Sequence, residues 1–327
     1  MMSLPTVFVT RRISPKALQK LQAEADVLVW PHEEPPSRDV LLREISKADA
    51  LLTLLTDPID RDVIQAATSR LKVISQMAVG TDNIDIAAAT QKGIPVGHTP
   101  DALTEACADF TWALMTAMAR RVVESHQEVT QGIWRPWGPS VLLGADLYGA
   151  TLGIVGLGRI GLAVARRAAG FNMHVCYYSR HRKPDIEHQY NLTYCDLDSL
   201  LSQSDYVSLH TSLNDQTDHL LNRERLALMK PSAYLINIAR GKVVDSEALT
   251  DALINHKIAG AALDVFDPEP MPVNHPLLKL KNVIVTPHIA SASIQARNVI
   301  ADMAVENILT ALHGQHIPYC FNPQVYG

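Results

Sequence analysis

A glycine-rich loop near the middle of the chain constrains the fold more than any other feature. The residues before it, 151–155, form an apolar stretch typical of a buried strand, the loop has the sequence GLGRIG, and residues 162–169 favour a helix. In this setting Gly156 permits a tight turn, Gly158 lets the backbone approach a phosphate, and Gly161 lets helix and strand pack closely. The N–H groups at the start of the helix would hold the phosphates. The loop therefore predicts a dinucleotide-binding α/β domain.

Strand-like and helix-like stretches alternate on both sides of this loop. Alternation at this spacing demands parallel strands that are joined by helical crossovers. We therefore expect an α/β fold with two doubly wound parallel-sheet domains, the second with six strands. The expected strands are residues 6–10, 27–30, 50–55, 72–76 and 95–97, and then 151–155, 174–178, 206–210, 234–238, 259–263 and 283–286.

Two long helical patterns indicate where the domains divide. The chain has 327 residues, which exceeds what one hydrophobic core usually fills. The helical patterns cover residues 101–131 and 291–313, and we expect both to cross between domains. After the first of them, residues 132–149 form an irregular segment that contains Trp134 and Trp137. We interpret this segment as an arm at a subunit contact, the alternative being that its tryptophans fill a local core.

Composition and charge exclude several classes of partner. The net charge of −5 and the pI of about 6.2 give no positive field for nucleic acid or an anionic membrane. No stretch approaches the roughly 20 apolar residues of a membrane span, and the N-terminus lacks the basic and apolar regions of a signal peptide. A cytoplasmic location is therefore the default expectation. The four cysteines lie far apart, so we expect reduced thiols and no metal site.

A basic run follows the second strand of the dinucleotide-binding region. About 20 residues after the glycine loop, an acidic residue usually binds the ribose 2′-hydroxyl of NAD(H). This chain has Ser179 there, followed by a basic run that includes Arg180, Arg182 and Lys183. Guanidinium groups bind a 2′-phosphate by charge-assisted hydrogen bonds, so the run favours NADP(H) over NAD(H). The alternative is a solvated surface run, with Asp185 or another group on the ribose.

Three ionisable residues stand in the segments just after predicted strands, namely Arg240, Glu269 and His288. Such positions face the ligand crevice of a doubly wound sheet. Reduction of a 2-oxo acid needs a cation for the carboxylate, an acid for the carbonyl oxygen, and a hydride donor within reach. Arg240, His288 and a nicotinamide would fill these roles, and Glu269 would keep the imidazole protonated and oriented. Each residue alone also has a structural interpretation, as an ion-pair partner, a loop carboxylate or a structural histidine.

Together these motifs resemble those of the D-isomer-specific 2-hydroxyacid dehydrogenases over nearly the whole chain. The resemblance implies a flavodoxin-like substrate domain, residues 1–100 completed by 291–327. A Rossmann cofactor domain, residues 101–290, would be inserted into it, with the active site between the two. The arginine, glutamate and histidine named above would be the catalytic set, in agreement with their chemistry. The resemblance rests on residues 79–83, 155–161, 229–244, 260–270 and 282–291.

The resemblance also implies roles for individual residues. The backbone around Val79 and Gly80 would bind the substrate carboxylate, together with Arg240 and His288. Asp264 would reach the carboxamide of the cofactor. The expected cofactor-binding residues are Thr104, Gly156, Gly158, Arg159, Ile160, Gly161, Ser179, Arg180, Arg182, Thr211, Ile238, Ala239, Asp264 and Ser291.

Within this family, residues 120–124 and 270–278 are most similar to those of glyoxylate and hydroxypyruvate reductases. Those enzymes usually prefer NADPH, which the basic run favours on separate grounds. We therefore expect hydride transfer from NADPH, or NADH, to a small 2-oxo acid such as glyoxylate or hydroxypyruvate, giving glycolate or D-glycerate. The same resemblance implies a homodimer in which Trp134 or Trp137 reaches the active site of the neighbouring subunit.

Two other functions remain open from the sequence. One is another dehydrogenase of the same family, acting on a phosphoglycerate or a larger 2-ketoaldonate. The other is a dinucleotide-sensing binding protein, similar to the transcriptional corepressors that share this fold. Such proteins can keep the same three ionisable residues, so only turnover of a reduced cofactor with a 2-oxo acid distinguishes them from a reductase.

Overall fold

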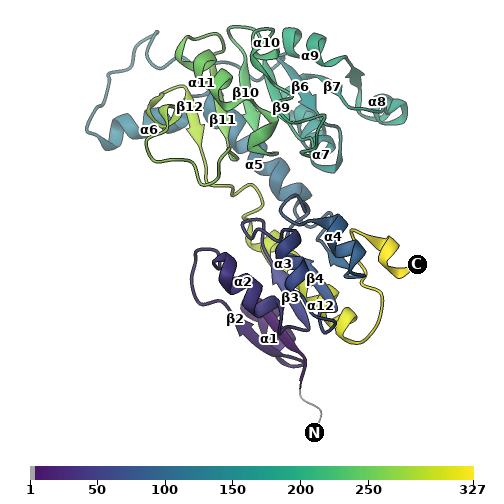
Figure 1. Ribbon diagram of the computed structural model, residues 1–327. Helices are drawn as coiled ribbons and strands as arrows, with labels where there is room; N and C mark the ends of the chain where they lie inside the picture. Colours follow the sequence, from purple (N-terminus) through teal and green to yellow (C-terminus); the bar gives the residue numbers. More distant parts are fainter. Residues whose placement is uncertain (1–3) are drawn as a thin grey trace. The chain divides into compact units, whose positions relative to one another are not determined.

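The computed structural model describes residues 4–327. The first three residues lie outside that range. The expectation that the N-terminus lacks a signal peptide rests partly on these three residues, so that part lies outside the described structure. The chain divides into two compact units, one formed by the chain up to Leu103 with Ala292–Gly327 and the other by Thr104–Ser291. Each unit has its own parallel sheet, and Figure 1 labels helices and strands of both where there is room.

The first unit contains a five-stranded parallel sheet in the order β2-β1-β3-β4-β5, the order of flavodoxin-like sheets. Successive side chains of β1 point to opposite faces. Val7 and Val9 pack in the core cluster that includes residues of α1 and α12, whereas Phe8 packs in the cluster that includes residues of α2, α3 and α4. Helices therefore cover both faces. The strands are β1 Thr6–Val9, β2 Asp26–Val29, β3 Ala50–Thr53, β4 Val73–Gln76 and β5 Val96–Gly97, and the helices are α1 Pro15–Gln22, α2 Arg38–Ile45, α3 Arg61–Ala66, α4 Ile86–Gln91 and α12 Ile294–Leu312.

The second unit contains a seven-stranded parallel sheet in the order β12-β11-β10-β9-β6-β7-β8. Strand β6 pairs with β7 on one side and with β9 on the other, so the strand order reverses there. Ligands of doubly wound sheets bind at the carboxyl ends of the strands beside such a reversal. The strands are β6 Thr151–Val155, β7 His174–Tyr178, β8 Leu192–Tyr194, β9 Tyr206–Leu209, β10 Tyr234–Asn237, β11 Gly260–Leu263 and β12 Val283–Val285, and the helices are α5 Thr104–Ala119, α6 Val122–Thr130, α7 Arg159–Ala168, α8 Pro184–Tyr190, α9 Leu197–Gln203, α10 Arg223–Leu226 and α11 Ser246–Ile254.

The predicted α/β fold with two parallel sheets is confirmed, and two details of the prediction are wrong. The second sheet has seven strands, because the three-residue β8 adds an edge strand beside β7 that is too short to show a sequence pattern. The single helix expected over residues 101–131 is two helices, α5 and α6. Arg121 between them has φ 53° and ψ 34°, a left-handed conformation through which a right-handed helix cannot continue.

Neither a membrane span nor a metal cluster is found among the described residues. None of the helices within residues 4–327 combines the length and the apolar character that crossing a membrane requires. In the same range no three His, Cys, Asp or Glu side chains gather as metal ligands would. The four cysteines are free thiols.

Candidate active site

The glycine-rich loop follows β6 and leads directly into α7. Gly156 has φ +99°, which L side chains rarely adopt, and a Cβ there would lie 2.8 Å from the backbone of His210. A Cβ at Gly161 would lie 2.2 Å from the carbonyl oxygen of Gly156. Both positions therefore require glycine. At Gly158 no described atom lies within 4 Å of such a Cβ, so the loop is open on that side.

The start of α7 fits an anionic ligand. The N–H groups of Gly158, Ile160 and Gly161 donate to no group within residues 4–327. A helix N-terminus carries a partial positive charge, and N–H groups of this kind bind phosphate. The open side at Gly158 lets a ligand approach the backbone. The loop therefore fits the pyrophosphate of a dinucleotide.

The carboxylate of Glu187 organises the basic run after β7. It accepts hydrogen bonds from the Arg182 guanidinium at 2.8 to 3.2 Å and from the Tyr177 hydroxyl at 2.7 Å. The Arg182 hydrogen bond, followed by that from Tyr177, holds the pKa of Glu187 below its usual value. Arg182 is thus engaged within the chain. The exposed Arg180 forms no hydrogen bond or ion pair with any described residue.

Lys183 is a further candidate for binding the cofactor. The sequence places it in the basic run but does not distinguish it from the other members of that run. Its ammonium group donates to the carbonyl oxygen of Leu157 at 2.6 Å, which places a positive charge at the glycine-rich loop. Its backbone N–H donates to the Tyr177 hydroxyl at 2.8 Å. The basic run therefore folds back toward the phosphate-binding loop. The sequence signal was the run itself, which does not tell which of its members turns inward.

The structure brings His288 and Glu269 together. Nδ1 of His288 lies 2.8 Å from Oε2 of Glu269, and Oε1 accepts a hydrogen bond from the Phe266 N–H at 2.8 Å. Burial opposes ionisation of Glu269, but the hydrogen bond and charge of His288, the Phe266 N–H and the charge of Arg240 outweigh it. The pKa of Glu269 therefore lies below its usual value. The ionised carboxylate holds the proton on Nδ1, which leaves Nε2 as the nitrogen for exchange with a ligand.

A buried carboxylate, that of Asp264, holds the segment that carries His288. It accepts hydrogen bonds from the Thr286 hydroxyl at 2.6 Å and from the N–H groups of Ile289 and Ala290 at 2.9 and 2.7 Å. The N–H of His288 donates to the carbonyl oxygen of Asp264 at 2.9 Å. His288 has φ +54°, a costly conformation that these bonds maintain. Sequence reasoning expected Asp264 only as a cofactor contact and missed this role.

Arg240 follows β10, and its carbonyl oxygen accepts a hydrogen bond from the buried Asn237 amide at 3.0 Å. The next residue, Gly241, lies against another loop, because a Cβ there would be only 1.9 Å from the carbonyl carbon of Phe266. The turn that carries Arg240 therefore contacts the backbone of the loop that carries Glu269. Backbone contact and charge coupling place the three catalytic candidates in one neighbourhood.

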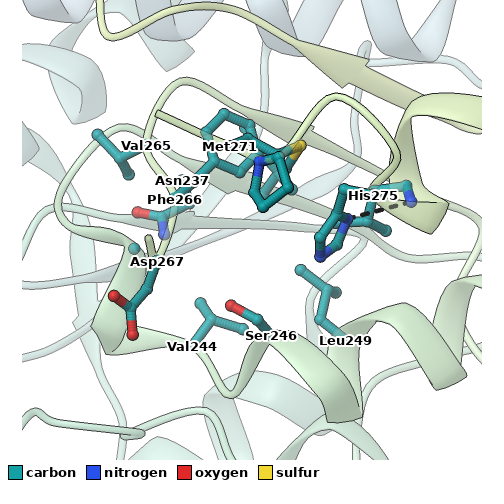
Figure 2. A pocket seen from close by; sticks show the side chains of 13 residues that line it. Asn237, Val244, Ser246, Leu249, Val265, Phe266, Asp267, Met271 and His275 are labelled. Carbon is teal, nitrogen blue, oxygen red and sulfur yellow. Dashed lines mark hydrogen bonds between the residues drawn. The ribbon is translucent and has the colours of Figure 1, made fainter. Parts of the chain in front are cut away.

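A small pocket adjoins this contact. Figure 2 shows some of the residues that line it, among them Asn237, Phe266 and Met271. Its volume of about 20 Å³ has room for about one water molecule, so it is not a substrate site. Its lining also includes His275, whose Nδ1 accepts a hydrogen bond from the Leu277 N–H at 3.3 Å.

In the first unit, the loop after β4 presents three N–H groups without a partner. The four carbonyl oxygens of residues 78–81 each accept a hydrogen bond from within the unit, at 2.9 to 3.2 Å. Because C=O and N–H of one peptide point in opposite directions, the N–H groups of Val79, Gly80 and Thr81 face the other way. None of the three donates to a group in the described chain. Successive backbone N–H groups of this kind can bind a carboxylate.

The other expected cofactor contacts stand at helix starts or after strands. Thr104 is the first residue of α5 and Arg159 the first residue of α7. Parallel strands have their carboxyl ends at one edge of the sheet, so residues that follow them share the edge with the glycine-rich loop. The expected contacts that follow strands in this way are Ser179, Thr211, Ile238, Ala239 and Asp264, and Ser291 is the last residue of the unit.

Comparison with known proteins identifies the family. The family described as D-isomer specific 2-hydroxyacid dehydrogenase, NAD binding domain, matches residues 112–290. The chain is 50% identical over 327 residues to a glyoxylate reductase of Thermofilum pendens, covering 99% of this chain and 96% of the relative. It is 48% identical over 322 residues to a glyoxylate reductase of Korarchaeum cryptofilum, with 98% and 97% covered. An NADPH-dependent glyoxylate/hydroxypyruvate reductase of Sinorhizobium meliloti, crystallised with NADP and malonate, matches with a TM-score of 0.84 and 30% identity, covering 98% of each chain.

The chain belongs to the D-isomer-specific 2-hydroxyacid dehydrogenases and is an NAD(P)-dependent dehydrogenase. Within that family it is similar to glyoxylate reductases over nearly its whole length. The family and the similarity to glyoxylate reductases that the sequence motifs predicted are thus confirmed.

Proposed function

We propose that this enzyme reduces small 2-oxo acids, in particular glyoxylate and hydroxypyruvate, with a hydride from NADPH. The observation that carries the proposal is the His288–Glu269 pair, joined at 2.8 Å and influenced by the charge of Arg240. An imidazole held by an ionised carboxylate is suited to protonate a carbonyl oxygen, and a guanidinium group binds a carboxylate in bidentate geometry. The similarity to glyoxylate reductases supports a small substrate.

In the proposed reaction, Nε2 of the protonated His288 gives its proton to the carbonyl oxygen of the 2-oxo acid. A nicotinamide dinucleotide held at the glycine-rich loop, residues 156–161, would supply the hydride for the carbonyl carbon, and the product would be the 2-hydroxy acid, glycolate or D-glycerate. Glu269 orients the ring and stabilises its charged form before transfer. For the substrate carboxylate the chain offers two sets of donors, the guanidinium group of Arg240 and the N–H groups of Val79 and Gly80.

A substrate panel with both cofactors tests this proposal. Purified protein is mixed with NADPH or NADH and with glyoxylate, hydroxypyruvate, 3-phosphohydroxypyruvate or a 2-ketoaldonate, and the absorbance of the reduced cofactor is followed. We expect the highest kcat/KM with NADPH and one of the first two acids. Preference for the phosphorylated or the larger acid would show that the substrate is wrong. No oxidation of either cofactor would show that the reductase function is wrong.

The preference for NADPH is proposed from Arg180 and Lys183. Arg180 is exposed, and Lys183 lies at the glycine-rich loop, so both have a charge to offer to a 2′-phosphate. Arg180→Ala should raise the KM for NADPH about 10- to 100-fold, as expected for a hydrogen bond to a charged group, and leave that for NADH unchanged. As a control, Arg166→Ala also removes one positive charge, but near the end of α7, and should change neither the KM for NADPH nor the KM for NADH. An equal rise in the KM for NADPH and for NADH would contradict the assignment of Arg180 to the 2′-phosphate.

We also propose that the arm, residues 132–149, contacts a second copy of the chain. The arm is anchored by an ion pair between Arg135 and Glu128 at 2.8 Å. Trp134 and Trp137 are 79% and 91% exposed, so they do not fill a local core of their unit. Exposed aromatic side chains of this kind are typical of protein–protein contacts. Sedimentation should show a dimer that Trp137→Ala weakens, and a monomeric wild type would refute the proposal.

A further inference from the structure

One buried side chain, that of Gln76, holds the loop that presents the three N–H groups. Gln76 is the last residue of β4 and is fully buried. Its Nε2 donates to the carbonyl oxygen of Gly80 at 3.2 Å and to Oδ1 of Asn83 at 2.6 Å. We propose that Gln76 is a positioning residue for the substrate carboxylate, because it fixes the peptide between Gly80 and Thr81. This inference rests on the proposed function, which assigns the carboxylate to this loop.

The orientation of the Gln76 amide is determined by its neighbours. Asn83 donates from Nδ2 to the carbonyl oxygens of Leu54 and Asp57 at 3.0 and 2.8 Å, so its Oδ1 faces Gln76 as an acceptor. Oε1 of Gln76 is buried and has no partner in the described chain. A reversed amide would place Oε1 against two acceptors and leave Nε2 without one. Gln76 therefore acts toward the loop as a donor.

This donor determines which way the Gly80–Thr81 peptide points. While the carbonyl oxygen of Gly80 accepts from Gln76, the N–H of Thr81 in the same peptide faces the opposite side. Without the Nε2 donor of Gln76, the carbonyl group of Gly80 loses the hydrogen bond that holds it toward the interior. Rotation of the peptide would then turn an oxygen, rather than an N–H, toward a carboxylate. The consequence is weaker binding of the anion, with no change to the groups that transfer hydride and proton.

The neighbouring strand residue supplies a matched control. Ser75 is also fully buried and also donates one side-chain hydrogen bond to a backbone carbonyl, that of Ala304 at 2.8 Å. Adjacent residues of a strand point to opposite faces, so Ser75 faces away from Gln76. Ser75→Ala thus removes a comparable interior hydrogen bond and leaves the loop after β4 in place. A merely structural role for Gln76 would make the two variants behave alike.

The test compares Gln76→Met, which keeps length and loses the donor, with Ser75→Ala in the full-length protein. We expect Gln76→Met to raise the KM for glyoxylate about tenfold, the effect of one lost hydrogen bond, with kcat and the Kd for NADPH nearly unchanged. Oxalate, a carboxylate probe that is not reduced, should lose affinity by a similar factor in calorimetry with NADPH present. Ser75→Ala should lower Tm without changing the KM or the oxalate Kd. Asn83→Ala, at a half-buried position, should show the same kinetic effect if Gln76→Met does not fold.

The outcomes separate this inference from the proposed function. A folded Gln76→Met, or Asn83→Ala in its place, with wild-type KM and oxalate affinity overturns the positioning role while the reductase function stands. A fall in kcat without a rise in KM also overturns it. If the wild type reduces no 2-oxo acid, the proposed function fails, and the oxalate measurement still tests whether Gln76 supports an anion site.

Discussion

Replacement of Gly241 by alanine tests whether the backbone contact beside Arg240 is needed for turnover. A Cβ at this position would lie 1.9 Å from the carbonyl carbon of Phe266, and ordinary contact begins at 3.4 Å, so the peptide must move by about 1.5 Å. Glu269 accepts a hydrogen bond from the Phe266 N–H at 2.8 Å and would move with it. Because a misplacement of about 1 Å costs about 100-fold in rate, we expect kcat to fall at least about 100-fold.

The assay is steady-state oxidation of NADPH at saturating glyoxylate, with the Kd for NADPH from fluorescence and folding checked by circular dichroism. The affinity for NADPH should change far less than kcat, because the glycine-rich loop is untouched. Gly170→Ala is the matched control, since no described atom lies within 4 Å of a Cβ there, and it should leave kcat unchanged. A folded Gly241→Ala with wild-type kcat would refute the claim that this contact positions Glu269.

Three further expectations follow from the same site. Glu269→Gln removes the charge that stabilises the imidazolium and should lower kcat at least about tenfold in steady-state assays, whereas a wild-type rate would exclude that role. In the folded protein the pKa of Glu269 lies below its usual 4.5. The ionised carboxylate therefore makes its full contribution to the free energy of unfolding above pH 4.5, and this contribution is lost as the pH falls through the lower pKa of the folded state. The Tm difference between wild type and Glu269→Gln should therefore shrink in calorimetry below about pH 4.5, and a constant difference would contradict the assignment. Asp264→Asn places an amide against donors and should cost about 2 kcal/mol or more in urea unfolding while slowing turnover, and a fully active, equally stable variant would refute its role.

The fold was predictable wherever a local pattern is complete. The strand, glycine loop and helix from Thr151 to Ala168 follow from the glycine spacing together with the apolar stretch before it and the helix-favouring residues after it, and the structure shows that Gly156 and Gly161 allow no side chain. The break between α5 and α6 was not predictable, because Arg121 is a good helix former and no glycine or proline marks the turn. The left-handed Arg121 is held by its ion pair with Glu124 at 2.8 Å, which the sequence does not reveal.

The site was predictable as far as strand ends could be counted. The sequence points to Arg240, Glu269 and His288 as candidates because they follow strands of one parallel sheet, where residues that follow strands gather at the same edge. The supporting residues depend on contacts between segments that are distant in sequence. Asp264 bonds to residues 22 to 26 positions further along, and Lys183 reaches 26 positions back to the glycine-rich loop. No local pattern distinguishes such residues from ordinary surface or core positions.

The central claim is that His288 transfers the proton while the enzyme moves a hydride from NADPH to a small 2-oxo acid. The most direct measurement is single-turnover oxidation of enzyme-bound NADPH after mixing with glyoxylate or hydroxypyruvate, for wild type and His288→Asn. We predict that the wild type oxidises NADPH with at least one of these acids. The variant should bind NADPH with nearly wild-type affinity and oxidise it at least about 100-fold more slowly, as expected for loss of a general acid. Wild-type enzyme that leaves NADPH unchanged, or a variant that is as fast as the wild type, would contradict this account.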